Sequence, residues 1–229
     1  SSTHDHFTLL EYNLLGDPSV QLPPLDGSSR AVVDQQYVTG NPVSVDASAH
    51  GYSDNATIQL FYRRVTIPWA AWHAYGEPRQ QPWEWQVTLD EGPGRYEFYT
   101  VLQDGNYSET RPDIPDAACI LDPAPPVIAF QQPTGGLYVA GRQLITRDTN
   151  RIVGLGAIHV VAEVTDETAG VESVMFYLDG ELQETDTAAP YQMTLTGPLF
   201  GSHEITVTAT DRAGNTATNR TSRWFIKLL

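Results

Sequence analysis

The sequence predicts an all-β protein built of two tandem β-sandwich domains. Short runs of apolar and β-branched residues recur along the chain, and no long stretch has the i, i+3, i+4, i+7 apolar spacing of a helix. Clusters of Gly, Pro, Asn and Asp separate these runs, as is typical of a sandwich. The two halves of the chain also repeat one another. The runs predicted as strands are ATIQLFYRR, PWEWQVTL, YEFYTVLQ, AIHVVAEV, VESVMFYL, YQMTLT, HEITVTAT and SRWFIKLL.

The internal repeat is the strongest of these observations. The first copy reads LFYRR, then PWEWQVTL, then GRYEFYTVLQDGN, and the second reads MFYLDG, then PYQMTLT, then GSHEITVTATDRAGN. Gly94 lies ten positions before Asp104, and Gly201 lies ten positions before Asp211. This shared spacing predicts two copies of one fold.

Alternation within the repeat predicts which side chains fill the cores. The predicted inward-facing residues are Ile205, Val207 and Ala209 in the second copy and Phe98, Thr100 and Leu102 in the first. A shift of one residue would turn the apolar set toward water, so the register is well specified. Thr100 is the one polar member, and we expect its hydroxyl to have a hydrogen-bond partner.

The chain is expected to divide at LDPAPP, residues 121–126, because consecutive prolines favour an extended and fairly stiff connector. The expected parts are an N-terminal strand segment (1–22), a first domain (23–122) and a second domain (123–229). The N-terminal segment has no counterpart before the second copy. Its apolar residues need a place for burial, on their own first sandwich or on a neighbouring copy in a head-to-tail polymer. These residues are Phe7, Leu9, Leu10, Leu14 and Leu15.

Composition restricts the compartment and the partners. The formal net charge of -15 disfavours nucleic-acid binding, because phosphate backbones would be repelled. No apolar run approaches the roughly 20 residues needed to cross a bilayer. The chain opens with SSTHDHF rather than a secretory signal, so we expect an internal or processed start. Three N-glycosylation patterns, at Asn55, Asn106 and Asn219, favour a secreted protein.

Cysteine and histidine provide no catalytic pattern. The single cysteine, Cys119, excludes an intrachain disulfide framework. We expect it to be a small buried residue beside the domain boundary; the alternatives are a nucleophile or an intermolecular bridge. His4 and His6 form an H-x-H pair without a third ligand nearby in sequence, whereas His203 occupies the strand position of Tyr96 and is expected to pack. The sequence contains no G-x-S-x-G, P-loop, H-E-x-x-H or C-x-x-C motif, so we expect no enzyme.

Aspartates at predicted strand ends are candidate calcium ligands. Asp211 opens DRAGN, Asp166 opens DETAG, and Asp122 lies at the domain boundary. Carboxylate oxygens at such positions can bind Ca²⁺, although no EF-hand-like loop is present. The alternative is that these side chains accept backbone hydrogen bonds that stabilise tight turns. Calcium is the one cofactor that the sequence raises.

Aromatic residues of the first copy have two interpretations. Trp69, Trp72 and Tyr75 could form a stacking platform for a sugar, or could fold over the core. Trp83 and Trp85 share one strand face, and we expect them in the core, because the second copy has Tyr191 and Met193 at the equivalent positions. The platform is therefore the candidate ligand site of this copy.

The segment EYNLLGDPSVQL, residues 11–22, resembles the final strand and turn of the caspase-like catalytic domain of gingipain-type cysteine peptidases (family C25). In that family an immunoglobulin-like domain commonly follows. The family's catalytic His and Cys lie upstream of this motif and are missing here, and Cys119 matches no catalytic position. The resemblance implies origin from a larger precursor, not peptidase activity.

The remainder resembles the tandem immunoglobulin-like repeats of large archaeal and bacterial surface proteins. The segments that carry this resemblance are PWEW, GRYEFYTVLQDGN, FYLDG, DTAAPY and DRAGN. It implies two tandem immunoglobulin-like sandwiches in a non-enzymatic structural or interaction module outside the cell or on its surface. The expected partners are proteins, including other copies of the chain. The alternatives are carbohydrate binding and an accessory region of a secreted C25-like cysteine peptidase.

Overall fold

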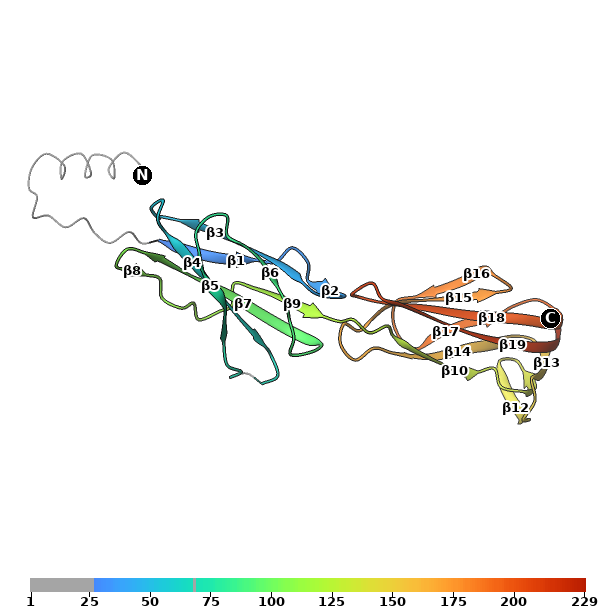
Figure 1. Ribbon diagram of the computed structural model, residues 1–229. Coiled ribbons are helices and arrows are strands. Elements are labelled where there is room, and N and C mark those ends of the chain that lie inside the picture. The colour runs from blue at the N-terminus through green and yellow to red at the C-terminus, as the bar shows by residue number, and fades with distance from the viewer. Residues whose placement is uncertain (1–26, 68) are drawn as a thin grey trace, which may run out of the picture.

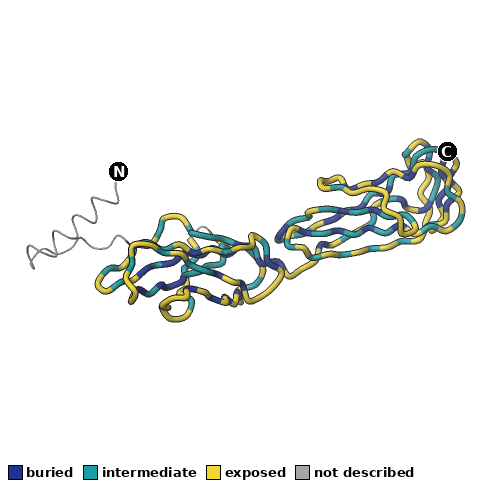
Figure 2. The backbone as a smooth tube through the Cα atoms, turned by 90° about the horizontal axis from the view of Figure 1, so that it is seen from above, coloured by how far each residue is buried: buried dark blue, intermediate teal, exposed yellow. Residues whose placement is uncertain are grey.

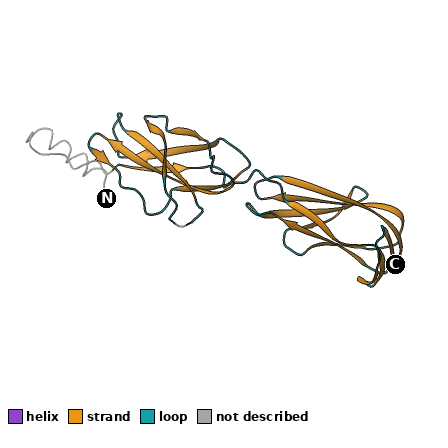
Figure 3. Cartoon of the chain, turned by 60° about the horizontal axis from the view of Figure 1, so that its bottom comes forward, coloured by secondary structure: helices purple, strands orange, loops and turns teal. Residues whose placement is uncertain are grey.

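The computed structural model describes residues 27–67 and 69–229, and within these ranges every regular element is a β-strand (Figure 3). The strands form two β-sandwiches that lie end to end (Figure 1). The first runs from Ser28 to Leu121 and the second from Val127 to Leu228. The segment Asp122–Pro126, which connects them, contains no strand. The N-terminal segment, with its five apolar residues, its H-x-H pair and its peptidase-like motif, lies outside the described residues.

The first sandwich consists of two sheets. One has the strand order β1-β3-β6 and the other β2-β9-β7-β4-β5, with β8 paired to β7. All pairings are antiparallel except that of β2 with β9, which is parallel. The strands are β1 (Ser28–Val32), β2 (Tyr37–Val38), β3 (Val43–His50), β4 (Thr57–Arg64), β5 (His73–Arg79), β6 (Glu84–Val87), β7 (Gly94–Asp104), β8 (Tyr107–Ser108) and β9 (Ala117–Leu121).

The second sandwich has the sheets β10-β14-β17 and β12-β11-β13-β19-β18-β15-β16. Strand β13 pairs in parallel with β19, as β2 does with β9, and also in parallel with β11. The strands are β10 (Val127–Gln132), β11 (Gly136–Val139), β12 (Arg142–Thr146), β13 (Arg151–Leu155), β14 (Ile158–Thr165), β15 (Val171–Leu178), β16 (Glu181–Asp186), β17 (Tyr191–Leu195), β18 (Leu199–Asp211) and β19 (Thr216–Leu228).

The two sandwiches share one connectivity, as the sequence repeat predicts. In each, the first strand pairs with one sheet, and the chain then crosses to pair in parallel with the last strand of the other. This is an immunoglobulin-like arrangement of two packed sheets. The second sandwich differs by the hairpin β11–β12, which widens its larger sheet. The fold is therefore two tandem immunoglobulin-like β-sandwiches.

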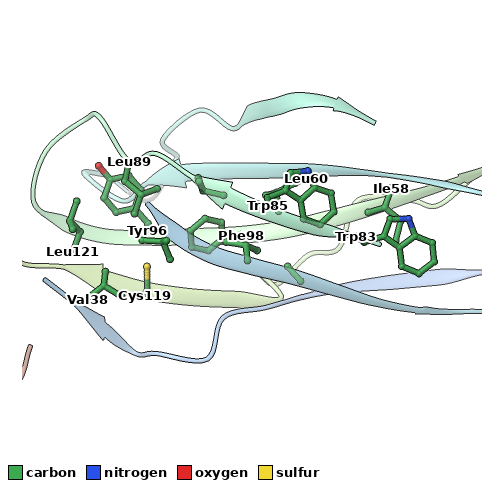
Figure 4. Packing of buried hydrophobic residues seen from close by; sticks show 14 of the residues in the cluster. Val38, Ile58, Leu60, Trp83, Trp85, Leu89, Tyr96, Phe98, Cys119 and Leu121 are labelled. Atoms are coloured by element: carbon green, nitrogen blue, oxygen red, sulfur yellow. The ribbon is translucent and has the colours of Figure 1, made fainter. Parts of the chain in front are cut away.

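Each sandwich has its own hydrophobic core between its sheets, seen as the buried stretches inside each half of the tube in Figure 2. All six residues predicted to face inward from β7 and β18 are fully buried. Trp83 and Trp85 are buried in the first core, where they lie with Phe98 and Tyr96 (Figure 4). The prediction that these two tryptophans are core residues is confirmed.

Cys119 lies on β9 with its side chain in the same core, beside Val38 and Tyr96 (Figure 4). The residue is 1% exposed, and burial raises the pKa of the thiol to about 11, although Arg95 lowers it. The thiol is therefore protonated and inaccessible at neutral pH. This confirms the expected packing role and contradicts the alternative of a reactive nucleophile.

Two carboxylates close the gap between β1 and β7 in the first sandwich. Glu109 accepts hydrogen bonds from the backbone N–H groups of Ser29 and Leu102. Asp116 accepts them from the N–H groups of Ala31 and Thr100, at 3.0 Å each. The Thr100 hydroxyl also donates to Asp116, at 3.4 Å, which is the partner that its inward position required. Side chains here replace backbone ladder bonds that the two strands do not form with each other.

Candidate functional site

The junction between the sandwiches gathers the three aspartates that the sequence singled out as metal ligands. Asp122 follows β9, Asp166 follows β14, and Asp211 ends β18. One carboxylate oxygen from each lies within 4.8 Å of the other two. Asp122 and Asp211 are fully buried, and Asp166 is half-buried. Residues distant in sequence thus form one acidic centre, which we call the junction triad.

Backbone hydrogen bonds fix each carboxylate of the triad. Asp166 Oδ1 accepts from the N–H groups of Thr168 and Gly170, at 3.2 and 2.6 Å, within its own turn. Asp211 Oδ1 accepts from the N–H of Asn215 at 2.9 Å. These contacts confirm the predicted role of the two aspartates in turns. The turns also fix the direction in which these two carboxylates point.

Asp122 connects the linker to the second sandwich. Its Oδ1 accepts from the N–H of Ala124 at 3.1 Å, and its Oδ2 accepts from the N–H of Ala169 at 2.9 Å. The side-chain amide of Asn215 donates to the backbone oxygen of Asp122 at 2.9 Å and to that of Ala124 at 3.2 Å. The same amide donates to Asp211 Oδ2 at 2.9 Å. The linker is therefore bonded to two loops of the second sandwich.

The charge of the triad is not balanced within the described part of the chain. No Lys, Arg or His side chain there forms an ion pair with Asp122, Asp166 or Asp211. Two ionised carboxylates at such a separation repel by about 3 kcal/mol at an effective dielectric of 20. Three hard oxygen ligands with a net negative charge suit Ca²⁺, which completes its 6–8 ligands with carbonyl and water oxygens.

An open groove of about 690 Å³ lies between the sandwiches, and Asp166 of the triad is part of its wall. Arg64 and Pro93 contribute to its wall from the first sandwich, and Thr165, Asp166 and Glu167 from the second. Asp166 Oδ2 accepts no hydrogen bond from the described residues, so this oxygen is available to a ligand. Of the three triad aspartates, Asp166 lines this groove, which Arg95 also lines from the first sandwich.

The aromatic candidates of the first sandwich do not form one platform. Tyr75 lies on β5 against the inner core, where its hydroxyl donates to the backbone oxygen of Gln86 at 2.6 Å. Trp72 packs edge-on against Tyr99 on the opposite, outer face of the sheet, with ring centroids 4.5 Å apart. Trp69 is 78% exposed. Trp72 and Tyr75 thus belong to different faces, although only two residues separate them.

The outer face of the first sandwich carries a cluster that sequence reasoning missed. Phe61 stacks on Tyr99 at 4.7 Å, and Trp72 packs against the same Tyr99 ring. The guanidinium groups of Arg63 and Arg111 lie over the Trp72 ring, at 4.5 and 5.3 Å. Tyr99 is consequently buried on a face that alternation turns toward water. Phe61 and Tyr99 are paired aromatic residues at outward positions, and this pairing was the available signal.

The sequon asparagines differ in their surroundings. Asn55 and Asn106 are exposed in tight turns, the first between β3 and β4 and the second between β7 and β8. Asn219 lies within β19, and its side-chain amide donates to the backbone oxygen of Ile128 at 2.9 Å. The first two positions are open to a glycan, whereas the amide nitrogen of Asn219 is already engaged between two strands.

His203 takes the packing position expected from the repeat. Its ring lies edge-on against Phe225, with centroids 5.9 Å apart, and its Nδ1 lies 2.6 Å from Asp179 Oδ2. That hydrogen bond lowers the pKa of Asp179. The contact holds the turn after β15 against β18, which is a structural role.

Comparisons with known proteins agree with the fold. Residues 126–207 match the family model described as a bacterial Ig domain. No curated protein sequence matches the chain significantly. No helix in the described ranges is long and apolar enough to cross a membrane. The second sandwich is thus similar to bacterial immunoglobulin domains.

Several solved structures match at low sequence identity. The fibronectin(III)-like modules of CbhA from Clostridium thermocellum match with a TM-score of 0.41 and 14% identity, over 86% of this chain and 94% of that one. A 1.5-MDa bacterial ice-binding adhesin matches with a TM-score of 0.42 and 13% identity, over 91% of this chain and 66% of that one. The FN1–FN3 domains of chicken CNTN1 match with a TM-score of 0.42 and 11% identity, over 90% and 68%.

Proposed function

We propose that the chain is a non-enzymatic structural and interaction module of an extracellular or cell-surface protein, and that its two sandwiches act as a stiff spacer. The observation that carries this proposal is the set of hydrogen bonds between the linker and the second sandwich at the junction. Asp122 and Asn215 attach the linker to the second sandwich, and prolines at 123, 125 and 126 limit its backbone freedom. The match of the second sandwich to bacterial Ig domains supports the surface role.

Small-angle X-ray scattering on the intact chain tests the spacer. We expect one elongated shape that ensemble fitting describes with a narrow distribution of interdomain angles. Asn215→Ala removes the amide that holds Asp122 and Ala124, so it should widen that distribution without unfolding either sandwich. Asn150→Ala is the matched control, because Asn150 is exposed and its side chain has no hydrogen bond. A broad distribution in the unmodified chain would overturn the spacer proposal.

The stiffness of the junction is proposed to depend on calcium held by the junction triad. Binding would offset the repulsion among three carboxylates and connect the linker to two loops of the second sandwich. Ca²⁺ should raise the unfolding temperature of the second sandwich relative to EDTA, and Mg²⁺ should do so less. Asp211→Asn should abolish the difference, whereas Asp148→Asn on an exposed turn should preserve it. Identical unfolding temperatures in Ca²⁺ and EDTA would contradict calcium binding, and the role of the triad would then be to accept hydrogen bonds in turns.

Carbohydrate binding is the second candidate function, and the ring of Trp69, which is 78% exposed, favours it. Binding on a glycan array that is lost in Trp69→Ala would support this candidate. Tyr75→Phe serves as the control, because Tyr75 lies on the inner side of the sheet. The absence of binding to any glycan on the array would count against carbohydrate as the ligand.

Assembly through the N-terminal segment is a further element of the proposal. Residues 1–22 would add to a neighbouring copy and produce a surface filament. Light scattering on a sizing column tests this, since a 25.3 kDa monomer contradicts it and a larger, polydisperse species supports it. Isolation of the chain joined to an upstream catalytic domain would instead support an accessory region of a C25-like peptidase.

A further inference from the structure

An apolar row crosses the outer face of the second sandwich at the end farthest from the junction. Strand pairing aligns one residue from each of five neighbouring strands. In spatial order they are Ile145 on β12, Leu137 on β11, Val153 on β13, Ile226 on β19 and Phe200 on β18. We call these five residues the distal apolar row. It runs from the free edge of the sheet toward its middle.

The distal apolar row faces outward. Ile152 and Phe225, the chain neighbours of Val153 and Ile226, are fully buried in the core, so alternation turns the row toward solvent. Four of its members are exposed, and Phe200 reaches 61%. Soluble monomers rarely leave a contiguous apolar surface of this kind uncovered, and such surfaces mark interaction sites.

Positive charge borders the row. Arg147 and Arg151 line a shallow apolar groove of about 280 Å³ together with Leu137, Ile145 and Val153. Neither arginine forms an ion pair with a carboxylate in the described part of the chain. The chain has a net charge of -15, and two arginines without a carboxylate partner beside an apolar groove indicate the chemistry of the occupant. It is an apolar segment that carries carboxylates.

Residues 1–22 have this chemistry. They contain the five apolar residues Phe7, Leu9, Leu10, Leu14 and Leu15. They also contain Asp5, Glu11 and Asp17, together with His4 and His6, and the first Lys or Arg of the chain is Arg30. Both the apolar content and the charge of this segment therefore complement the groove.

The layout of the sandwiches places Gly27, the first described residue, and the row at opposite ends of the described structure. Strand β7 starts at the junction, where Gly94 pairs with Leu121, and ends at the far end of the first sandwich. Gly27 lies at that far end, where its backbone oxygen accepts a hydrogen bond from Tyr107. The row lies beside β12 and β13 at the other end of the molecule (Figure 1). Copies arranged head to tail would bring the segment of one to the row of the next.

We propose that the distal apolar row, with Arg147 and Arg151 at its margin, is the acceptor site for residues 1–22 of a second copy. The inference rests on the proposed assembly role and names its acceptor. Strand β12 is the outermost strand of its sheet among the described residues, so its edge can also pair with an incoming strand. Repetition of one such contact produces an open, head-to-tail filament.

Binding of a labelled peptide of residues 1–22 to the intact chain tests the proposal by fluorescence anisotropy. We expect saturable binding that weakens at least tenfold in Val153→Glu. The matched control is Leu182→Glu, which introduces the same charge at an exposed leucine on β16, the opposite edge of the same sheet. Circular dichroism on both variants verifies the fold. No saturable binding, or equal loss in both variants, would overturn the acceptor assignment.

A charge exchange tests separately whether Arg147 and Arg151 contribute to peptide binding. The double variant Arg147→Glu, Arg151→Glu should weaken the peptide at least fivefold, and a peptide with Glu11→Arg and Asp17→Arg should recover binding to it. Failure of the exchange would remove the charge component of the proposal. If the intact chain assembles but the peptide does not bind at the distal apolar row, the assembly proposal is retained and the acceptor assignment is contradicted.

Discussion

At the scale of single residues, burial decides chemistry more than residue type does. Cys119 has a reactive side chain and Asp122 of the junction triad has a ligating one, and both lie beside the domain boundary in sequence. The thiol enters an apolar core and is inert, whereas the carboxylates meet backbone N–H groups that orient them. The same stretch of chain therefore provides one inert residue and one candidate ligand three positions apart.

The Cys119 thiol provides a probe of unfolding. Because burial raises its pKa to about 11, the native protein should react with a thiol reagent at pH 8 far more slowly than the urea-unfolded chain. A folded pKa above the unfolded value of 9.0 stabilises the native state below pH 9, and that stability is lost as pH rises toward 11. Reaction kinetics with and without urea measure the first effect, and equal rates would contradict the burial.

At the scale of elements, the first sandwich depends on side chains where its strands do not pair. Glu109 and Asp116 come from the segment between β8 and β9 and bond the N–H groups of β1 and β7. Backbone N–H groups at this seam between β1 and β7 thus donate to carboxylates instead of to carbonyl groups of a neighbouring strand. The segment consequently acts as part of the sandwich rather than as a connecting loop.

Removal of the Asp116 carboxylate should weaken this seam. Asp116→Ala leaves the N–H groups of Ala31 and Thr100 without an acceptor, at a cost of about 2–4 kcal/mol for the first sandwich. Asp116→Asn retains an acceptor oxygen and should cost less. Urea unfolding of each variant measures the difference. A loss below about 0.5 kcal/mol in the alanine variant would show that water replaces the carboxylate.

At the scale of the whole molecule, two separate cores lie in line. One core comprises residues from Ala31 to Leu121 and the other from Tyr138 to Phe225, so each sandwich buries its own apolar surface. Domains with separate cores can unfold separately. The junction contributes polar contacts, in which the linker is hydrogen-bonded to loops of the second sandwich.

Core truncation should therefore affect one unfolding transition at a time. Phe176→Ala, at a fully buried position in the second core, should destabilise that sandwich by about 3–5 kcal/mol. The transition of the first sandwich should stay in place, and tryptophan fluorescence reports it because four of the five tryptophans lie there. Calorimetry on the variant checks both effects. Equal shifts of both transitions would mean that the junction couples the sandwiches thermodynamically.

The sequence by itself determined the eight strands that it predicts, the repeat and the inward-facing residues of the two cores. Alternation with a period of two and a shared spacing of ten positions are local properties, and burial followed them at Phe98, Leu102, Ile205 and Val207. The turn role of Asp166 and Asp211 was equally local. In these cases, the interacting groups are neighbours along the chain or along one strand.

Only the tertiary structure decided which distant residues meet. Asp122, Asp166 and Asp211 converge because the linker and two loops are brought to one end of the second sandwich, and no spacing in the sequence encodes that distance. The distal apolar row requires the register of five strands, including the parallel pairing of β13 with β19. Strand pairing also brings Phe61 beside Tyr99, the ring against which Trp72 packs. Local patterns specify which face a side chain takes, whereas strand pairing specifies its neighbours.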